Sequence, residues 1–294
     1  FLIARHDVLR TAILWQEMRQ PLQVVCREAK LIIEQLEFSE NEDLLTQMQQ
    51  YQNQKQHFIN LESAPLIQLQ AMHEPSTDKH AILFTEHHII TDQVGLQVLI
   101  HELAIYLNGK KSQLPPSTPY RNFVGYVLHQ TKSINSKKFF SQMLSDVDFT
   151  TTPFNLTNTQ GSGNNVYELR SNLSDKLSSK IRQQAIKLSI SPSVIFHAGW
   201  ALIVAQCSAR NDVVFGTVMS GRLQDVKGIE SMLGMFINTL PLRVKLEGLT
   251  VVELIRQIEQ SIQALIPYEQ VSLARAQQYS RLSTEQSLFS ALIN

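Results

Sequence analysis

A short apolar run that leads directly into a polar turn and then into a helix constrains the fold of this chain more than any other feature. Residues 81–85 read Ala-Ile-Leu-Phe-Thr, which is typical of a buried strand. The polar segment 86–92, Glu-His-His-Ile-Ile-Thr-Asp, follows at once. The helix predicted next has one apolar face, formed by Leu96, Leu99, Ile100, Leu103 and Leu107. The sequence therefore predicts a strand–turn–helix unit whose turn presents polar side chains to a cleft.

The rest of the chain mixes strands and helices in the same way. Apolar runs predict further strands at residues 22–25, 65–72, 167–173, 212–219 and 238–246. Helical spacing predicts helices at residues 1–14, 40–58, 120–145, 174–188, 191–208 and 251–266. The helix at 191–208 is almost wholly apolar, so we expect it to be buried. A glycine-containing loop is expected at 157–165, and the fold class is α/β (α+β).

The chain has 294 residues, which is enough for two lobes. The clearest cluster of turn-forming residues is 108–117. We therefore expect an N-terminal lobe at 1–115 and a C-terminal lobe at 116–294. The chain opens in a helix-like run and stops in a strand-like run, which predicts that both lobes are truncated parts of a longer polypeptide.

Composition narrows the class of function. Lys and Arg together number 26, as do Asp and Glu, so the net charge is zero and argues against broad binding of nucleic acid or anionic membranes. Cys26 and Cys207 lie in no metal-binding spacing and are expected to be free thiols. No apolar run has the length of a membrane span, and the start lacks a signal-peptide pattern, so we expect a cytoplasmic protein.

His87 and His88 are the candidate catalytic residues. An imidazole titrates near about pH 6.5, so it can accept and return a proton in aminolysis of a thioester. Adjacent residues of an extended segment point in opposite directions, so only one histidine is expected to face the substrate. The alternative is that the pair has a packing role. No HExxH, GxSxG or P-loop pattern accompanies it, so neither a metal nor a covalent nucleophile is expected.

Asp92 needs a partner if it is buried. Arg5 has apolar residues at its helical neighbour positions, and a charge among them is costly unless it is paired. We therefore hypothesise an Arg5–Asp92 ion pair that braces the histidine segment. The alternative is that Arg5 extends to solvent.

Four sequence blocks occur in an order that resembles the condensation domains of nonribosomal peptide synthetases, enzymes of secondary metabolism that include antibiotic producers. Residues 5–11 resemble the arginine-rich motif of the first helix, and residues 87–92 resemble the HHxxxDG motif. Residues 212–222 and 234–243 resemble the two blocks that follow. The resemblance covers essentially the whole chain.

The resemblance implies a chloramphenicol acetyltransferase-like fold, with two similar lobes in a V around a central tunnel. It implies that His88 is the catalytic residue and that Asp92 and Arg5 are structural supports. Asn238 and Ser220 fall in blocks that approach the tunnel, although a polar strand-end role is equally open for Asn238. His87 completes the motif.

The implied reaction joins two aminoacyl or peptidyl thioesters through an amide bond. The implied partners are donor and acceptor peptidyl carrier proteins, which carry the substrates on phosphopantetheine arms, and an adenylation domain in cis. No bound cofactor, metal, nucleic acid or membrane is implied.

Gln93 replaces the glycine of the motif, and glycine would let the backbone turn freely there. Together with residues 157–163 and 288–294, this change is similar to the dual condensation/epimerisation branch, whose members would invert the α-carbon of the donor. Other interpretations are a degenerate domain that only docks partners, a coenzyme A-dependent acyltransferase of the same fold, and a dedicated epimerase. The native flanking sequence would help to separate them.

Overall fold

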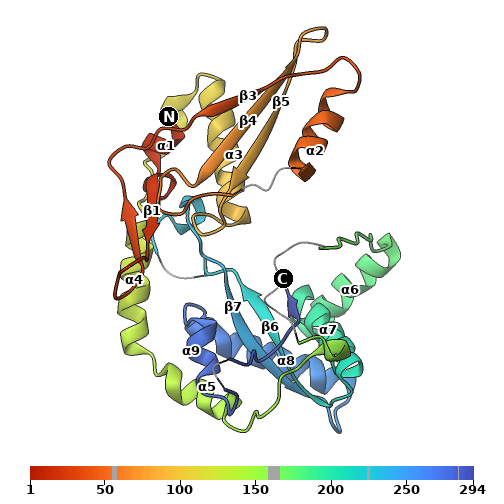
Figure 1. Cartoon of the computed structure of the whole chain (residues 1–294). Helices are drawn as coiled ribbons and strands as arrows, with labels where there is room; N and C mark the ends of the chain where they lie inside the picture. Colours follow the sequence, from red (N-terminus) through yellow and green to blue (C-terminus); the bar gives the residue numbers. More distant parts are fainter. Residues whose placement is uncertain (55–57, 158–165, 224–225, 284) are drawn as a thin grey trace. The chain divides into compact units, whose positions relative to one another are not determined.

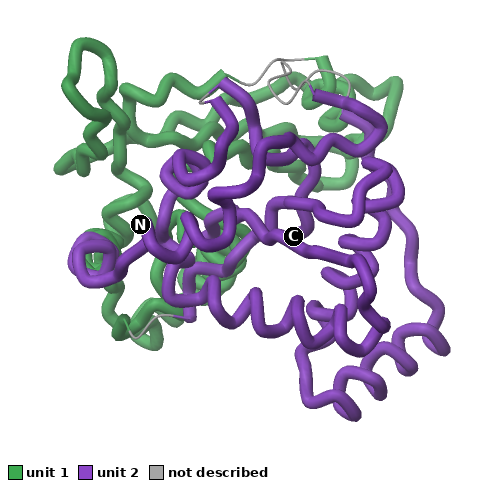
Figure 2. Tube along the Cα trace, turned by 90° about the horizontal axis from the view of Figure 1, so that it is seen from below, with its two compact units in different colours: residues 1–126, 224–236 green, residues 127–223, 237–294 purple. Residues whose placement is uncertain are grey.

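The computed structural model describes residues 1–54, 58–157, 166–223, 226–283 and 285–294. The chain forms two compact units, shown in green and purple in Figure 2. Unit 1 consists of Phe1–Tyr126 and Gln224–Phe236, and unit 2 of Val127–Leu223 and Ile237–Asn294.

The division between the units differs from the expected boundary at residues 115 and 116. The proline-rich segment runs on into helix α4 (Tyr120–Ser133), and the start of α4 packs within unit 1. Tyr120 and Phe123 contact Phe236 with ring centroids 5.4 and 4.5 Å apart. This aromatic cluster brings a distant segment into unit 1, so the unit is not continuous in sequence.

Unit 1 contains two small sheets (Figure 1). Strand β1 (Thr11–Leu14) pairs antiparallel with β2 (Leu22–Val25). In the other sheet β3 (Ile33–Leu36) runs parallel to β4 (Ile67–Glu74), which pairs antiparallel with β5 (Lys79–Glu86). The strands predicted at 22–25, 65–72 and 81–85 are confirmed to within two residues at every end.

The helices of unit 1 cover both faces of the three-stranded sheet. They are α1 (Leu2–Arg5), α2 (Leu44–Gln54) and α3 (Gln93–Leu107), with 3₁₀ turns at Asp7–Arg10 and Lys111–Gln113. Side chains alternate along a strand, so β5 contributes to an apolar cluster on each face of the sheet. Ala81 packs against α2, in a cluster with Leu44, Met48 and Met72. Phe84 packs on the other face, in the α3 cluster described next. The α3 cluster is centred on Val8, Leu9, Leu66, Ile67, Ile90, Leu99 and Leu233.

The single helix predicted at residues 1–14 is wrong. His6 is extended, with φ −109° and ψ 120°, and it ends α1. Thr11 and Ile13 then pair with β2, where β-branched side chains fit a pleated surface better than a helix. Strand pairing thus overrides the helical spacing of the apolar residues.

Unit 2 is built on a sheet of β6 (Asp212–Met219), β7 (Asn238–Lys245) and β8 (Leu292–Ile293). Strand β6 pairs antiparallel with β7 and parallel with β8. Its helices are α5 (Ser136–Leu144), α6 (Asp175–Leu188), α7 (Pro192–Ser208), α8 (Val251–Leu265) and α9 (Leu273–Gln277), with the remainder of α4 and 3₁₀ turns at Pro153–Asn155 and Ile266–Tyr268. A third 3₁₀ turn, Ile229–Ser231, belongs to unit 1.

The helices and strands predicted for unit 2 are mostly confirmed, with three differences. The single helix predicted at 120–145 is two helices, α4 and α5, separated at residues 134 and 135. No strand forms at 167–173, where Leu169 is 98% exposed and has no strand partner. Helix α7 is only partly buried, because Phe196 and Ile203 are 45% and 55% exposed. The loop expected at 157–165 lies, apart from its first residue, outside the described residues.

Among the described residues, no single helix has the length and apolarity of a membrane span. Helices α6 and α7, which meet at a bend of 107°, pass this test only as a pair. Helix α7 contributes Val194, Ala201 and Val204 to the core of unit 2, and core helices of globular proteins pass the same test.

Candidate active site

The histidine turn, residues 87–91, links the end of β5 to the start of α3. The His87 N–H donates to the Leu66 carbonyl at 3.1 Å, and the Ile90 N–H donates to the His87 carbonyl at 3.1 Å. Ile90 is fully buried and anchors the turn in the α3 cluster. Backbone hydrogen bonds and one buried apolar side chain therefore anchor the turn to unit 1.

The His88 side chain forms a hydrogen bond to the backbone of its own turn. Its Nδ1 lies 2.9 Å from the Thr91 carbonyl oxygen. A carbonyl can only accept, so Nδ1 carries the proton and the neutral ring keeps its lone pair on Nε2. The residue is exposed.

His87 has a different role. Its Nδ1 accepts a hydrogen bond from the Ile89 N–H at 3.1 Å, and the residue is half-buried. The ring therefore closes the turn. That only one of the two histidines faces the substrate stays a prediction.

Asp92 is 1% exposed and acts as the N-cap of α3. Its Oδ1 accepts from the Gly95 N–H at 2.8 Å, and its Oδ2 accepts from the Phe236 N–H at 3.2 Å. The carboxylate thus ties the end of the histidine turn to the returning segment of unit 1. Gln93 is exposed and is the first residue of α3, so its helical backbone does not need the conformational freedom of glycine.

The hypothesised Arg5–Asp92 ion pair is wrong. Arg5 instead binds Glu102 of α3, with Nε 2.8 Å from Oε2 and a terminal nitrogen 3.1 Å from Oε1, and it also donates to the Pro115 carbonyl. Asp92 lies at the N-terminus of α3, where backbone N–H groups attract a carboxylate. Glu102 lies ten residues further along the helix and meets α1.

His6 completes the Arg5–Glu102 contact and is 3% exposed. Its Nε2 lies 2.7 Å from Glu102 Oε2. Burial lowers the pKa of His6 and outweighs the opposite effect of Glu102. Burial acts to raise the pKa of Glu102, but the hydrogen bonds from Arg5 and His6 outweigh it and hold that pKa below its usual range. Arg5 thus ties α1 to α3 through Glu102, a partner that sequence reasoning missed.

Glu86, the last residue of β5, is a second residue that sequence reasoning missed. Its Oε2 is buried and has no hydrogen-bond partner in the described part of the chain. Burial raises its pKa; the nearby His88 opposes this effect and Asp92 adds to it. The signal in the sequence was a lone acidic residue directly before the histidine pair.

Asn238 and Ser220 belong to unit 2. Asn238 begins β7, and its side-chain amide donates to the carbonyls of Glu269 and Val271 at 2.8 and 2.7 Å. Ser220 follows β6, is exposed, and accepts from the Arg222 N–H at 3.4 Å. Asn238 thus has a structural role at a strand end, and the tunnel-lining roles of both residues stay predictions.

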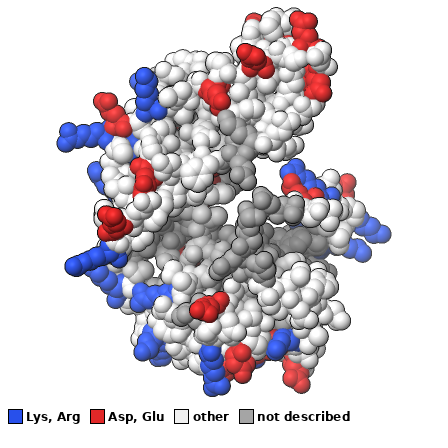
Figure 3. Space-filling view, viewed as in Figure 1, with Lys and Arg blue, Asp and Glu red and all other residues white. Residues whose placement is uncertain are grey.

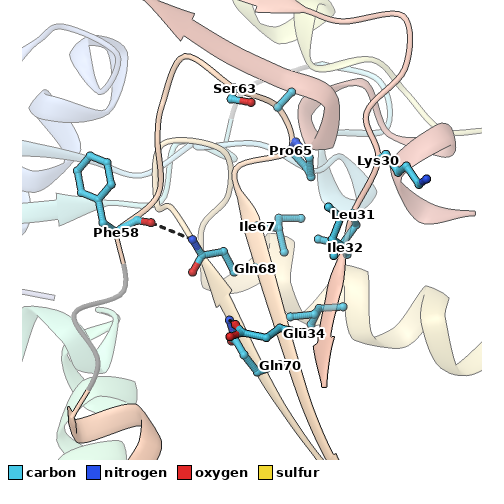
Figure 4. A pocket seen from close by; sticks show the side chains of 12 residues that line it. Lys30, Leu31, Ile32, Glu34, Phe58, Ser63, Pro65, Ile67, Gln68 and Gln70 are labelled. Atoms are coloured by element: carbon cyan, nitrogen blue, oxygen red, sulfur yellow. Dashed lines mark hydrogen bonds between the residues drawn. The ribbon is translucent and has the colours of Figure 1, made fainter. Parts of the chain in front are cut away.

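Two cavities flank the sheet of unit 1. One, of about 450 Å³, lies along β3 and β4, and Figure 4 shows the Gln68 amide pointing to the Phe58 carbonyl, 2.8 Å away. The other, of about 650 Å³, is bounded by α1, α3 and the sheet, and its lining is almost wholly apolar, including Leu31, Ile82 and Ile100. Ile67 lines both cavities. Its cross-strand partner is Glu86, the residue directly before the histidine turn.

A family model for the condensation domain matches residues 1–294. The chain belongs to the condensation-domain family. Malpibaldin synthetase from Mortierella alpina is 36% identical over 294 residues, which are all of this chain and 5% of that protein. Tyrocidine synthase 2 from Brevibacillus parabrevis is 30% identical over 292 residues, covering 97% of this chain and 8% of that protein.

Solved condensation domains share the fold. The condensation domain of the monacolin K polyketide synthase superposes with a TM-score of 0.75 at 14% identity, covering 98% of this chain and 67% of that one. The first condensation domain of the calcium-dependent antibiotic synthetase gives 0.74 at 15% identity, with 98% and 68% covered. The chloramphenicol acetyltransferase-like fold class is therefore confirmed. The chain spans a small part of the synthetases and about two thirds of these solved domains.

Proposed function

We propose that this condensation domain forms the amide bond between a donor and an acceptor aminoacyl or peptidyl thioester, each held on a carrier protein by phosphopantetheine. The observation that carries the proposal is the His88 tautomer, because the Thr91 carbonyl holds the proton on Nδ1 and leaves Nε2 to accept one. The relatives are peptide synthetases, which supports carrier and adenylation domains as partners.

In the proposed reaction, the acceptor amine attacks the donor thioester carbonyl carbon. A C–N bond forms as the C–S bond breaks, and the amine proton moves to His88 Nε2. The resulting imidazolium then gives this proton to the departing thiolate, so the histidine returns to its starting state. Asp92 and His87 hold the turn and so position the ring.

Epimerisation of the donor residue before condensation is a finer proposal that rests on the resemblance around Gln93. A cytoplasmic location also stays a prediction. The docking-only and coenzyme A-dependent alternatives remain distinct outcomes of the test below.

The test loads donor and acceptor carrier proteins and follows the peptidyl product by mass spectrometry, with the domain in its native polypeptide. His88→Ala should lower the rate by about a hundredfold or more, because it removes the proton acceptor. The matched control is His101→Ala, an exposed histidine of α3, which should leave the rate unchanged. Chiral analysis of the donor residue tests epimerisation.

A folded wild type that binds carriers but forms no product across several substrate pairs would favour the docking role. Product formed from free acyl-coenzyme A would favour the acyltransferase alternative. Isomerised donor without any dipeptide would favour the dedicated epimerase. Equal rates for wild type and His88→Ala would contradict the assignment of His88.

A further inference from the structure

The far end of the β4–β5 hairpin brings two histidines and an aspartate together. His73 and His80 are cross-strand partners, and Asp78 lies in the turn between them. One ligand atom from each residue lies within 4.8 Å of the other two. The side chains of His73 and Asp78 are 41% and 88% exposed, and His80 is exposed too, so an ion can reach the group from solvent.

The three side chains lie close together, but their ligand atoms are not yet arranged as in a chelate. His73 Nε2 lies 3.0 Å from Asp78 Oδ1, and the rings of His73 and His80 stack with centroids 4.3 Å apart. Metal–ligand bonds of about 2.0–2.2 Å place two ligand atoms of one ion about 3–4 Å apart. The two rings must therefore turn out of their stack for their lone pairs to converge, and their exposure leaves room for that rotation.

The surrounding charge favours a cation. Figure 3 shows Asp and Glu side chains gathered at the end of the molecule where Figure 1 places this turn. Segment 73–80 contains Glu74 and Asp78 against one cation, Lys79. Two acidic groups beside the two imidazoles raise the local concentration of a positive ion.

The donor set indicates the class of ion. Imidazole suits zinc, copper and nickel, whereas magnesium and calcium prefer sites built wholly from oxygen atoms. Two imidazoles and one carboxylate are three ligands, so water would complete the coordination. The pairing of β4 with β5 places residues 73 and 80 opposite each other. Sequence reasoning did not find the group, because the predicted strands, 65–72 and 81–85, excluded both histidines.

We propose that His73, Asp78 and His80 form a surface site for one divalent transition-metal ion of the zinc class. The site lies at the end of the β4–β5 hairpin opposite to the histidine turn. It does not depend on the proposed condensation reaction.

The test titrates the full chain with Zn²⁺ by calorimetry and with Co²⁺ by visible absorption. The wild type should bind one Zn²⁺ at this site, and His73→Ala and His80→Ala should each weaken that binding by about tenfold or more. Asp78→Asn should also weaken it, and this variant keeps the turn because asparagine tolerates the left-handed backbone at φ 54°. Binding should weaken at low pH, because protons compete with the ion for the imidazole nitrogens.

Two controls make the result decisive. His101→Ala removes an exposed histidine of the same unit and should leave Zn²⁺ binding unchanged. Circular dichroism should show that each variant is folded. The proposal is overturned if the wild type takes up no Zn²⁺, or if uptake is the same in His73→Ala and His80→Ala, whatever the outcome of the condensation assay.

Discussion

At the scale of single residues, the site depends on how each polar side chain is satisfied. His88 has its proton placed by a backbone carbonyl, and Asp92 has both oxygens engaged by backbone N–H groups. Glu102 is engaged by Arg5 and His6. Because removal of one partner leaves the other buried and unpaired, each of these contacts has a measurable consequence.

Glu102→Gln tests the Arg5–His6–Glu102 contact. At pH 7 the variant should lower the unfolding free energy of unit 1 by about 2–4 kcal/mol, because Arg5 loses its charged partner. The folded pKa of Glu102 lies below its unfolded value of about 4.3, so its contribution is complete above that pH and is lost as pH falls through the folded pKa. The difference between wild type and variant should therefore shrink toward pH 3.

Urea unfolding at pH 7 and pH 3 measures this difference. Glu62→Gln, at an exposed position, is the control and should change little at either pH. A pH-independent difference for Glu102→Gln would show that the charge of Glu102 does not stabilise the unit. A double-mutant cycle should give a larger coupling for Arg5 with Glu102 than for Arg5 with Asp92.

At the scale of elements, α3 and α8 both begin at a capping side chain, but the two capping residues differ in burial. Thr250 caps α8 in unit 2, where it forms a capping box with Glu253 on the surface. Asp92 caps α3 in unit 1 from a buried position and also accepts from the Phe236 N–H. The capping side chain of α8 thus stabilises only the start of its own helix, whereas that of α3 also binds the returning segment.

Comparison of Thr250→Ala with Asp92→Ala measures this difference. Thr250→Ala should cost about 1 kcal/mol, the usual effect of losing an N-cap. Asp92→Ala should cost about 3 kcal/mol or more, because it leaves a buried N–H of the returning segment without its acceptor. Denaturant unfolding of each variant is the measurement, and equal costs would mean that the Phe236 contact adds nothing.

At the scale of the whole molecule, unit 1 is completed by a segment that returns from far along the chain. Phe236 packs on Tyr120 and Phe123, and the Tyr120 hydroxyl donates to the Met235 carbonyl. Gly234 has φ +158°, and a Cβ built there would lie 2.1 Å from the Tyr120 ring. Only glycine allows the segment to approach this closely.

Gly234→Ala should displace the returning segment from Tyr120. Hydrogen exchange followed by mass spectrometry should show faster exchange in peptides of 226–236 and in unit 1, with unit 2 close to wild type. Gly248→Ala is the control for positive φ alone, because the structure has nothing within 4 Å of a Cβ at that position. Unchanged exchange in both regions would contradict the packing argument.

The sequence by itself determined the family, most of the local elements and the position of the histidine turn. These features rest on short-range patterns, such as strand alternation at 81–85 and the His87–Asp92 motif, that neighbouring residues encode directly. Only the tertiary structure decided which residue Arg5 pairs with, where the first predicted helix breaks into a strand, and that residues near 236 complete unit 1. Those choices depend on which buried polar groups and apolar faces meet across long stretches of chain, and local spacing does not specify such meetings.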